Sequence, residues 1–121
     1  LVSRILNHKS VATTMRAYTG TETISASLSG ANTVVNGRDG YFVLVLGYLL
    51  VASDNIEVAF ESESGTVVSG PYDIAANGGN ISTPVGLGQF VCNKNEDLIL
   101  DLGGPIHVGG HIVYALVRGG N

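Results

Sequence analysis

The sequence predicts an all-β protein, an antiparallel β-sandwich of jelly-roll type that follows a short N-terminal arm. Between residues 24 and 117, short segments rich in β-branched and aromatic residues alternate with clusters of Gly, Asn, Asp and Pro. The segments recur at a spacing of roughly 8–12 residues, which is typical of sandwiches and barrels. Because no long helical periodicity separates them, the pattern excludes a parallel α/β sheet.

The N-terminal part of the chain has a different pattern. Leu1, Val2, Ile5 and Leu6 have the spacing of one helical face, and Ser10 is placed to cap a second short helix. The change to the β pattern falls near residue 18 to residue 23. We therefore expect a short helical or extended arm over residues 1–23 and a sandwich domain over residues 24–121.

The start of the arm leaves two interpretations open. Met15 is the only methionine and lies just ahead of the β pattern. Residues 1–14 are therefore either a functional arm or an upstream extension of a chain that starts at Met15.

The β region predicts ten strands. The longest, at residues 41–52, is apolar on both faces, as expected when the opposing sheet covers one side and a neighbouring subunit or the arm covers the other. This strand is our first argument for assembly. The strands are predicted at residues 24–28, 33–35, 41–52, 56–62, 66–68, 72–75, 80–82, 89–92, 98–102 and 111–117.

Residues 56–63 alternate between apolar and acidic side chains. Ile56, Val58 and Phe60 fall on one side of the extended chain, and the glutamates fall on the other. Turn-forming residues flank the segment at both ends. We therefore expect a half-exposed antiparallel strand with a well-fixed register.

Few residues of the chain are charged. Charged residues make up 13% of the 121 residues, hydrophobic residues make up 45%, and there are 17 glycines, whereas soluble proteins average about 25% charged residues. A chain of this length has room for one domain with one core. Such a small domain must either expose neutral surface or bury it against partners, so we expect an oligomer.

The charges and the apolar segments also exclude some partners. The net charge is −4, and beyond the arm only Arg38, Lys94 and Arg118 are basic, whereas phosphate contacts need clustered Lys and Arg. The apolar segment at 41–52 is too short to span a bilayer. Cys92 is the sole cysteine and is expected to be a core thiol. We expect neither a nucleic-acid nor a membrane partner.

No group of residues in the β region has the pattern of a catalytic or cofactor site. His107 and His111 could share a metal from one side of a strand, but no Cys, Asp or Glu nearby completes the ligand set that zinc needs. Residues 93–97 are rich in oxygen ligands but lack the spacing of a calcium loop. Residues 86–88 resemble half of a phosphate loop without the helix that should follow. We predict no catalytic residue, no cofactor and no bound metal.

Residues 5–18 read Ile-Leu-Asn-His-Lys-Ser-Val-Ala-Thr-Thr-Met-Arg-Ala-Tyr. This segment resembles the C-terminal catalytic end of phage-type tyrosine recombinases. The resemblance implies that Tyr18 corresponds to the nucleophile that attacks a DNA phosphate and that His8 corresponds to an active-site histidine. The other catalytic groups of that family have no counterpart here, and a nucleophile without an electrostatic clamp loses most of its rate. We therefore expect no enzymatic activity.

A second resemblance covers about residues 24–118. The segments that carry it lie at 41–52, 56–60, 70–71, 75–79, 95–100 and 108–114. They resemble the small all-β structural proteins of tailed bacteriophages, which decorate or cement capsids or form parts of fibres and spikes. Both resemblances indicate a phage or prophage origin.

The leading hypothesis is therefore a capsid decoration or cement protein of the virion. It would be assembled in the host cytoplasm, form a homotrimer and bind the major capsid protein on the outer capsid surface, because partners must cover what the small core cannot. One histidine per subunit could converge on the trimer axis. The side chains expected at oligomer or capsid contacts are Leu1, Ile5, Leu6, Tyr41, Val43, Tyr48, His107 and His111.

Two other functions are kept as alternatives. A receptor-binding or glycan-binding fibre or spike module would use Tyr72 beside Asp73 as its sugar contact. A tyrosine recombinase fragment ranks last.

Overall fold

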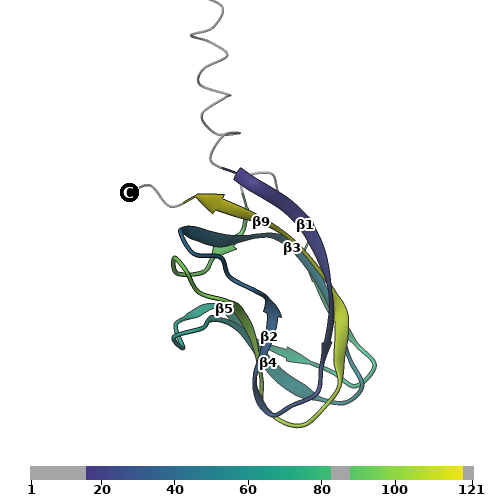
Figure 1. Cartoon of the computed structure of the whole chain (residues 1–121). Coiled ribbons are helices and arrows are strands. Elements are labelled where there is room, and N and C mark those ends of the chain that lie inside the picture. The colour runs from purple at the N-terminus through teal and green to yellow at the C-terminus, as the bar shows by residue number, and fades with distance from the viewer. Residues whose placement is uncertain (1–15, 83–87, 119–121) are drawn as a thin grey trace, which may run out of the picture.

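The computed structural model describes the backbone of residues 16–82 and 88–118 and the side chains of 19–82 and 88–118. These residues form nine strands (Figure 1). Within these ranges no helix is long and apolar enough to cross a membrane. The strands are β1 (Arg16–Ala26), β2 (Gly30–Val35), β3 (Tyr41–Ala52), β4 (Ile56–Ser62), β5 (Val67–Ile74), β6 (Gly79–Ser82), β7 (Phe90–Val91), β8 (Leu98–Leu102) and β9 (Val108–Arg118).

The strands form two antiparallel sheets that face each other (Figure 1). Sheet A has the order β1-β9-β3-β6, and β7 also pairs with β3. Sheet B has the order β2-β8-β4-β5. Among the described strands, β4 and β5 both belong to sheet B and β6 and β7 both belong to sheet A, while every other pair of consecutive strands is divided between the two sheets. The predicted all-β antiparallel sandwich is confirmed.

The core lies between the two sheets. Val43 and Leu50 reach it from sheet A, and Phe60 reaches it from sheet B, all with 0% exposure. The ring of Tyr48 meets the Phe60 ring edge-on at a centroid distance of 5.0 Å, a favourable aromatic geometry. Cys92 is 1% exposed, so the prediction of a core thiol is confirmed.

Three predicted strands have the observed bounds, namely β3, β4 and β8. The alternation predicted for β4 is confirmed, because its Ile56, Val58 and Phe60 are buried while Glu57 is exposed. β3 is apolar throughout, β8 is apolar except for Asp101, and β4 alternates except at Ala59, so each of these strands has a clear local pattern. The turn ahead of β4 carries the chain from sheet A to sheet B, so it does not close a hairpin.

The sandwich begins earlier than the sequence pattern indicates. β1 starts at Arg16, so residues 16–23, which the sequence pattern assigned to a helical or extended arm, form part of a strand of sheet A. β1 pairs with β9 from Arg16 opposite Val117 to Ala26 opposite Val108. The hydrogen bonds that fix this strand come from a partner far away in the sequence. Residues 1–15 lie outside the described residues.

The strand β5 joins two segments that the sequence separates, 66–68 and 72–75. Pro71 lies inside it. β5 is an edge strand of sheet B, and its register against β4 shifts near Pro71. A proline is tolerated there because the missing amide hydrogen has no partner to satisfy at a sheet edge.

Candidate functional site

The outward surface of sheet A has no Asp, Glu, Lys or Arg among its described side chains, and we call it the neutral face. Side chains alternate along a strand, so Leu49 and Val51, which flank the buried Leu50, point outward. Leu49 lies opposite His111 of β9 and Ile81 of β6. The neutral face consists of Thr19, Thr21, Thr23 and Ser25 of β1; Phe42, Leu44, Leu49 and Val51 of β3; Ile81 of β6; Val91 of β7; and His111, Val113, Ala115 and Val117 of β9.

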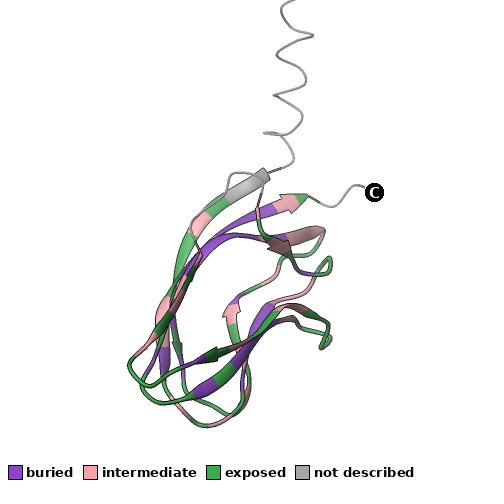
Figure 2. Cartoon of the chain, turned by 180° about the vertical axis from the view of Figure 1, so that it is seen from behind, coloured by how far each residue is buried: buried purple, intermediate pink, exposed green. Residues whose placement is uncertain are grey.

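Apolar side chains of the neutral face are open to solvent. The side chain of Ile81 is 72% exposed, that of Val91 is 45% exposed and that of Val51 is 44% exposed. Figure 2 shows how exposed and buried segments alternate along the strands. Exposed apolar groups gathered on one face mark an interaction site more often than scattered ones do.

The outward surface of sheet B is acidic. Its strands contain no Lys, Arg or His. Glu57 of β4 lies directly opposite Asp73 of β5, and Asp101 of β8 lies opposite Ala59. We call the surface formed by Glu57, Glu61, Asp73 and Asp101 the acidic face.

The acidic face contains a carboxyl group with a perturbed pKa. Partial burial, and secondly the charge of Asp101, raise the pKa of Glu61 above its usual value. Both causes disfavour the ionised form of the carboxyl group. The charge of Asp101 therefore disfavours ionisation of Glu61, and no cation among the described side chains of sheet B neutralises the acidic face.

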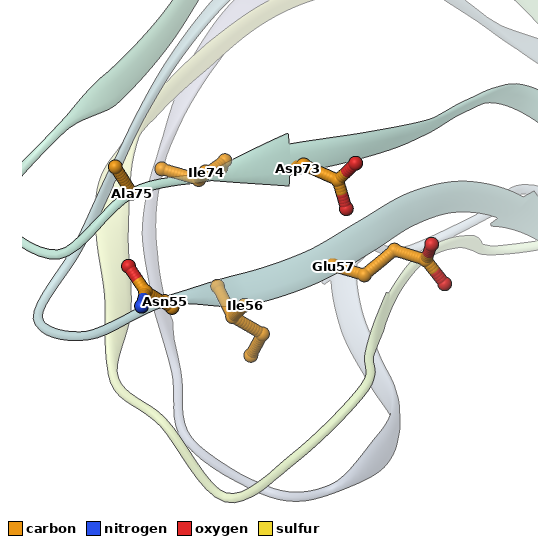
Figure 3. Close-up of a pocket in the computed structure, with 6 residues that line it drawn as sticks. All are labelled: Asn55, Ile56, Glu57, Asp73, Ile74 and Ala75. Carbon is orange, nitrogen blue, oxygen red and sulfur yellow. The ribbon is translucent and has the colours of Figure 1, made fainter.

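One end of the acidic face is hollowed (Figure 3). The depression lies at the end of the β4–β5 pair, and Glu57 and Asp73 contribute their carboxylates to its rim. The Asn55 side chain accepts a hydrogen bond of 2.8 Å from the amide of Ala76, which ties the neighbouring turn to the rim. The lining residues are Asn55, Ile56, Glu57, Asp73, Ile74 and Ala75.

Tyr72 and Asp73 do not form a joint sugar contact. Consecutive residues of a strand point to opposite faces. Tyr72 packs against the core, with its ring 6.2 Å from that of Tyr48, and shares a hydrogen bond with Ser69. Asp73 is exposed on the acidic face. The arrangement that motivated the glycan-binding alternative is therefore absent.

The expected contact residues lie in different environments. Val43 and Tyr48 are 0% and 5% exposed in the core, so their side chains are not available to a partner. Tyr41 is half-buried at one end of the sandwich, where the guanidinium carbons of Arg38 and Arg118 lie 5.3 Å and 5.7 Å from its ring centroid. Leu1, Ile5 and Leu6 lie outside the described residues.

His111 is exposed on β9, and His107 is exposed in the segment just before β9. Nε2 of His107 is 3.2 Å from Oγ of Ser25, while His111 lies in the next row between Thr23 and Leu49. In the described part of the chain, no three His, Cys, Asp or Glu side chains are close enough to hold a metal ion. These two histidines alone do not form a zinc site.

The oxygen-rich loop at 93–97 has internal hydrogen-bond partners. The Glu96 carboxylate accepts hydrogen bonds from the Ser62 hydroxyl at 2.6 Å and from the Ser64 amide at 3.0 Å. Asp97 accepts one from the amide of Gly37 at 2.5 Å. The loop oxygens therefore hold neighbouring turns together.

Sequence reasoning found half of the acidic face and missed the rest. The alternation in β4 placed Glu57 and Glu61 on a solvated side. Asp73 and Asp101 join them only through the pairing of β4 with β5 and β8. For the neutral face, the apolar sequence of β3 indicated a covered surface on both sides of this strand. No sequence pattern indicated which strands lie beside β3.

The recombinase-like residues fall at the edge of the described chain. Tyr18 lies in β1, where its backbone pairs with Leu116 of β9, and its side chain is not described. His8 lies outside the described residues. Comparisons with protein family models, with curated proteins and with solved structures find no significant match to this chain.

Proposed function

We propose that this chain is a structural protein of a tailed-phage virion, a capsid decoration or cement protein that binds the outer surface of the major capsid protein. The observation that carries the proposal is the contrast between the two outward surfaces of one small sandwich. The neutral face offers apolar side chains, with Ile81 72% exposed, to a protein neighbour in the virion, either a second copy of the chain or the capsid protein. The acidic face keeps the other side solvated. The resemblance of the β region to phage structural proteins agrees with this role.

We propose further that the sandwich is a jelly roll. A jelly roll has eight strands in two four-stranded sheets. The strand orders β1-β9-β3-β6 and β2-β8-β4-β5 support this fold when β6 and β7, which both pair with β3, are counted as one interrupted strand. In that count successive strands alternate between the sheets, except for β4 and β5.

In the proposed virion the chain is a homotrimer, and residues 1–15 contribute an arm that lies over a neighbour or the shell. β1 starts beside the end of β9, so any preceding segment leaves the sandwich at the end that carries Tyr41 and Arg118. Deletion of residues 1–15 tests the arm without removing β1. Loss of capsid binding supports the arm, and unchanged binding contradicts it.

The test of the whole proposal is co-sedimentation with capsid shells assembled from the major capsid protein of the same genome. We expect saturable binding at about 10 μM or below, and shells that withstand heating better with the protein bound. No pelleting with shells, together with specific binding on a glycan array, would replace decoration by the receptor-binding alternative.

A further inference from the structure

The neutral face continues across four neighbouring strands without a charged side chain in its described part. One cross-strand row runs from Thr23 through His111 and Leu49 to Ile81. We infer that a second copy of this chain covers the neutral face in solution. The inference rests on the proposed assembly function and assigns its self-association to one surface.

The size of the face suits association between copies. β1, β9 and β3 have 11, 11 and 12 residues and run for up to about 40 Å over a width of about 14 Å, while β6 and β7 add 4 and 2 residues beside β3. The face therefore measures roughly 650 Å². A stable protein interface buries about 800 Å² on each partner. The neutral face of one copy thus supplies most of the area that a stable interface needs.

Charge favours this face over the others when both partners are copies of one anionic chain. The net charge is −4, so two copies repel each other unless their carboxylates stay apart. Layers in a sandwich are about 10 Å apart, so two copies packed through their neutral faces keep their acidic faces about 30 Å apart. That distance is several times the Debye length of about 8 Å at physiological salt.

The opposite arrangement is unfavourable. Packing through sheet B would bring Glu57, Asp73 and Asp101 of one copy against the same carboxylates of the other. Like charges at a protein interface cost several kcal/mol. A basic partner would bind the acidic face rather than the neutral face, because the neutral face offers no carboxylate to a basic side chain.

The side chains of the neutral face also allow close approach. Ser25, Gly109, Val51 and Gly79 form a row of small residues next to the row that contains Leu49. Small and β-branched side chains leave a flat surface, and Ile81 stands at its edge as an apolar anchor with 72% exposure. Buried apolar anchors dominate the energy of an interface.

The closing experiment measures molar mass by light scattering and sedimentation at about 100 μM and about 1 μM. The monomer mass is 12.5 kDa. We expect a multiple of this mass at the higher concentration. A dimer would support the neutral face as the interface while contradicting the proposed trimer. A monomer at the higher concentration overturns the inference.

Substitutions on the two sides of the sandwich identify the surface. Ile81→Glu and Val51→Glu place carboxylates on the neutral face, and we expect association at least about tenfold weaker. Leu28→Glu and Val67→Glu are the matched controls, because their side chains are 68% and 53% exposed away from that face. Circular dichroism verifies that each variant folds. Equal dissociation by the controls overturns the assignment.

Thiol labelling gives a second measurement of association that does not require a charged side chain to be introduced. Ile81→Cys should react with a maleimide several-fold more slowly at the concentration where copies associate, whereas Leu28→Cys should react at one rate throughout. Cys92 is buried and does not compete for the reagent. Equal rates for Ile81→Cys at both concentrations contradict the inference.

The outcomes separate this inference from the proposed function. Self-association through the neutral face without capsid binding upholds the inference and rejects the decoration role. Capsid binding by a chain that stays monomeric at about 100 μM rejects the inference, and the neutral face is then the capsid contact. In that case Ile81→Glu would weaken pelleting with shells.

Discussion

The hydroxyl of Ser62 donates a hydrogen bond of 2.6 Å to Oε1 of Glu96 and so joins β4 to the loop that precedes β8. Ser62 is 0% exposed, and its oxygen also accepts a hydrogen bond of 3.0 Å from the backbone amide of Asn93. In the same loop, Oδ1 of Asn95 accepts a hydrogen bond from the backbone amide of Gly40. One buried hydroxyl thus organises the loops at the end of the sandwich where β1 begins.

The first prediction concerns this hydroxyl. Ser62→Ala should lower the free energy of unfolding by about 1–3 kcal/mol, because the amide of Asn93 loses its acceptor and Glu96 loses a donor. Chemical denaturation measures the difference. The exposed Ser53→Ala is the control, with an expected change below about 0.5 kcal/mol. Equal effects of the two substitutions would show that the Ser62 hydroxyl has no special role.

Glu96 should make stability sensitive to acid. The hydrogen bond from the Ser62 hydroxyl, followed by that from the Ser64 amide, lowers the pKa of Glu96 below its ordinary 4.5, since both favour the ionised form. A lowered folded-state pKa gives a contribution that is full above the ordinary value and is lost as pH falls through the lowered value. The thermal midpoint should therefore fall as the pH drops below the ordinary value of 4.5. Ser62→Ala should show a smaller fall, and an identical profile would contradict the prediction.

The fold could be predicted where the sequence pattern is local and complete. β3 and β8 are almost wholly apolar and β4 alternates over most of its length, and the bounds of all three strands match. β1 was misplaced because its β character depends on pairing with β9, which lies some ninety residues away in the chain (Thr23 pairs with His111). The spacing of apolar residues at the beginning of the chain is that of a helix, and no local sequence feature marks Arg16 as the first residue of β1.

The surfaces were harder to predict because they combine strands from distant parts of the sequence. The apolar β3 indicated a covered second face, and that prediction led to the neutral face. The same apolar pattern led us to expect contacts at Val43 and Tyr48, which are core residues. An apolar strand without alternation does not reveal which of its sides faces the core. Only the pairing of β3 with β9 shows which β3 side chains face inward and which face outward.

The acidic face should cost stability at neutral pH. Partial burial and the Asp101 charge raise the pKa of Glu61, so its ionised form is disfavoured in the folded chain. A raised carboxyl pKa means that the native state loses stability as pH rises through the folded value. Glu61→Gln should therefore stabilise the protein by roughly 0.2–1 kcal/mol at pH 7 and have no such effect in acid.

Asp39→Asn is the matched control for Glu61→Gln. It removes one negative charge from an exposed loop away from the acidic face. A double-mutant cycle with Asp101→Asn tests the coupling, since neighbours that repel each other give non-additive effects. An equal gain from Asp39→Asn would trace the effect to net charge alone.

Cys92 should be inert in the folded protein. Burial in the core, as the largest cause, raises the pKa of its thiol to about 12. Thiol reagents react with the thiolate, which is both scarce and shielded here. We expect no labelling of the native protein at pH 7 and one equivalent after denaturation. Labelling within minutes under native conditions would contradict the buried position of Cys92.

Gly110 of β9 should be difficult to replace. Its φ is +147°, and a Cβ added there would lie 1.8 Å from the carbonyl oxygen of Leu49, a backbone atom that cannot move without breaking the β3–β9 ladder. Gly110→Ala should therefore destabilise the protein by about 3 kcal/mol or more. Gly104→Ala is the control, because nothing lies within 4 Å of its added Cβ.

The strain caused by an Ala at position 110 should also disturb the neutral face, because Gly110 is the neighbour of His111 in β9 and pairs with Leu50 of β3. We therefore expect Gly110→Ala to unfold at lower denaturant and to associate more weakly, with Gly104→Ala unchanged in both measurements. A stable, fully associated Gly110→Ala variant would contradict the close packing of β9 on β3.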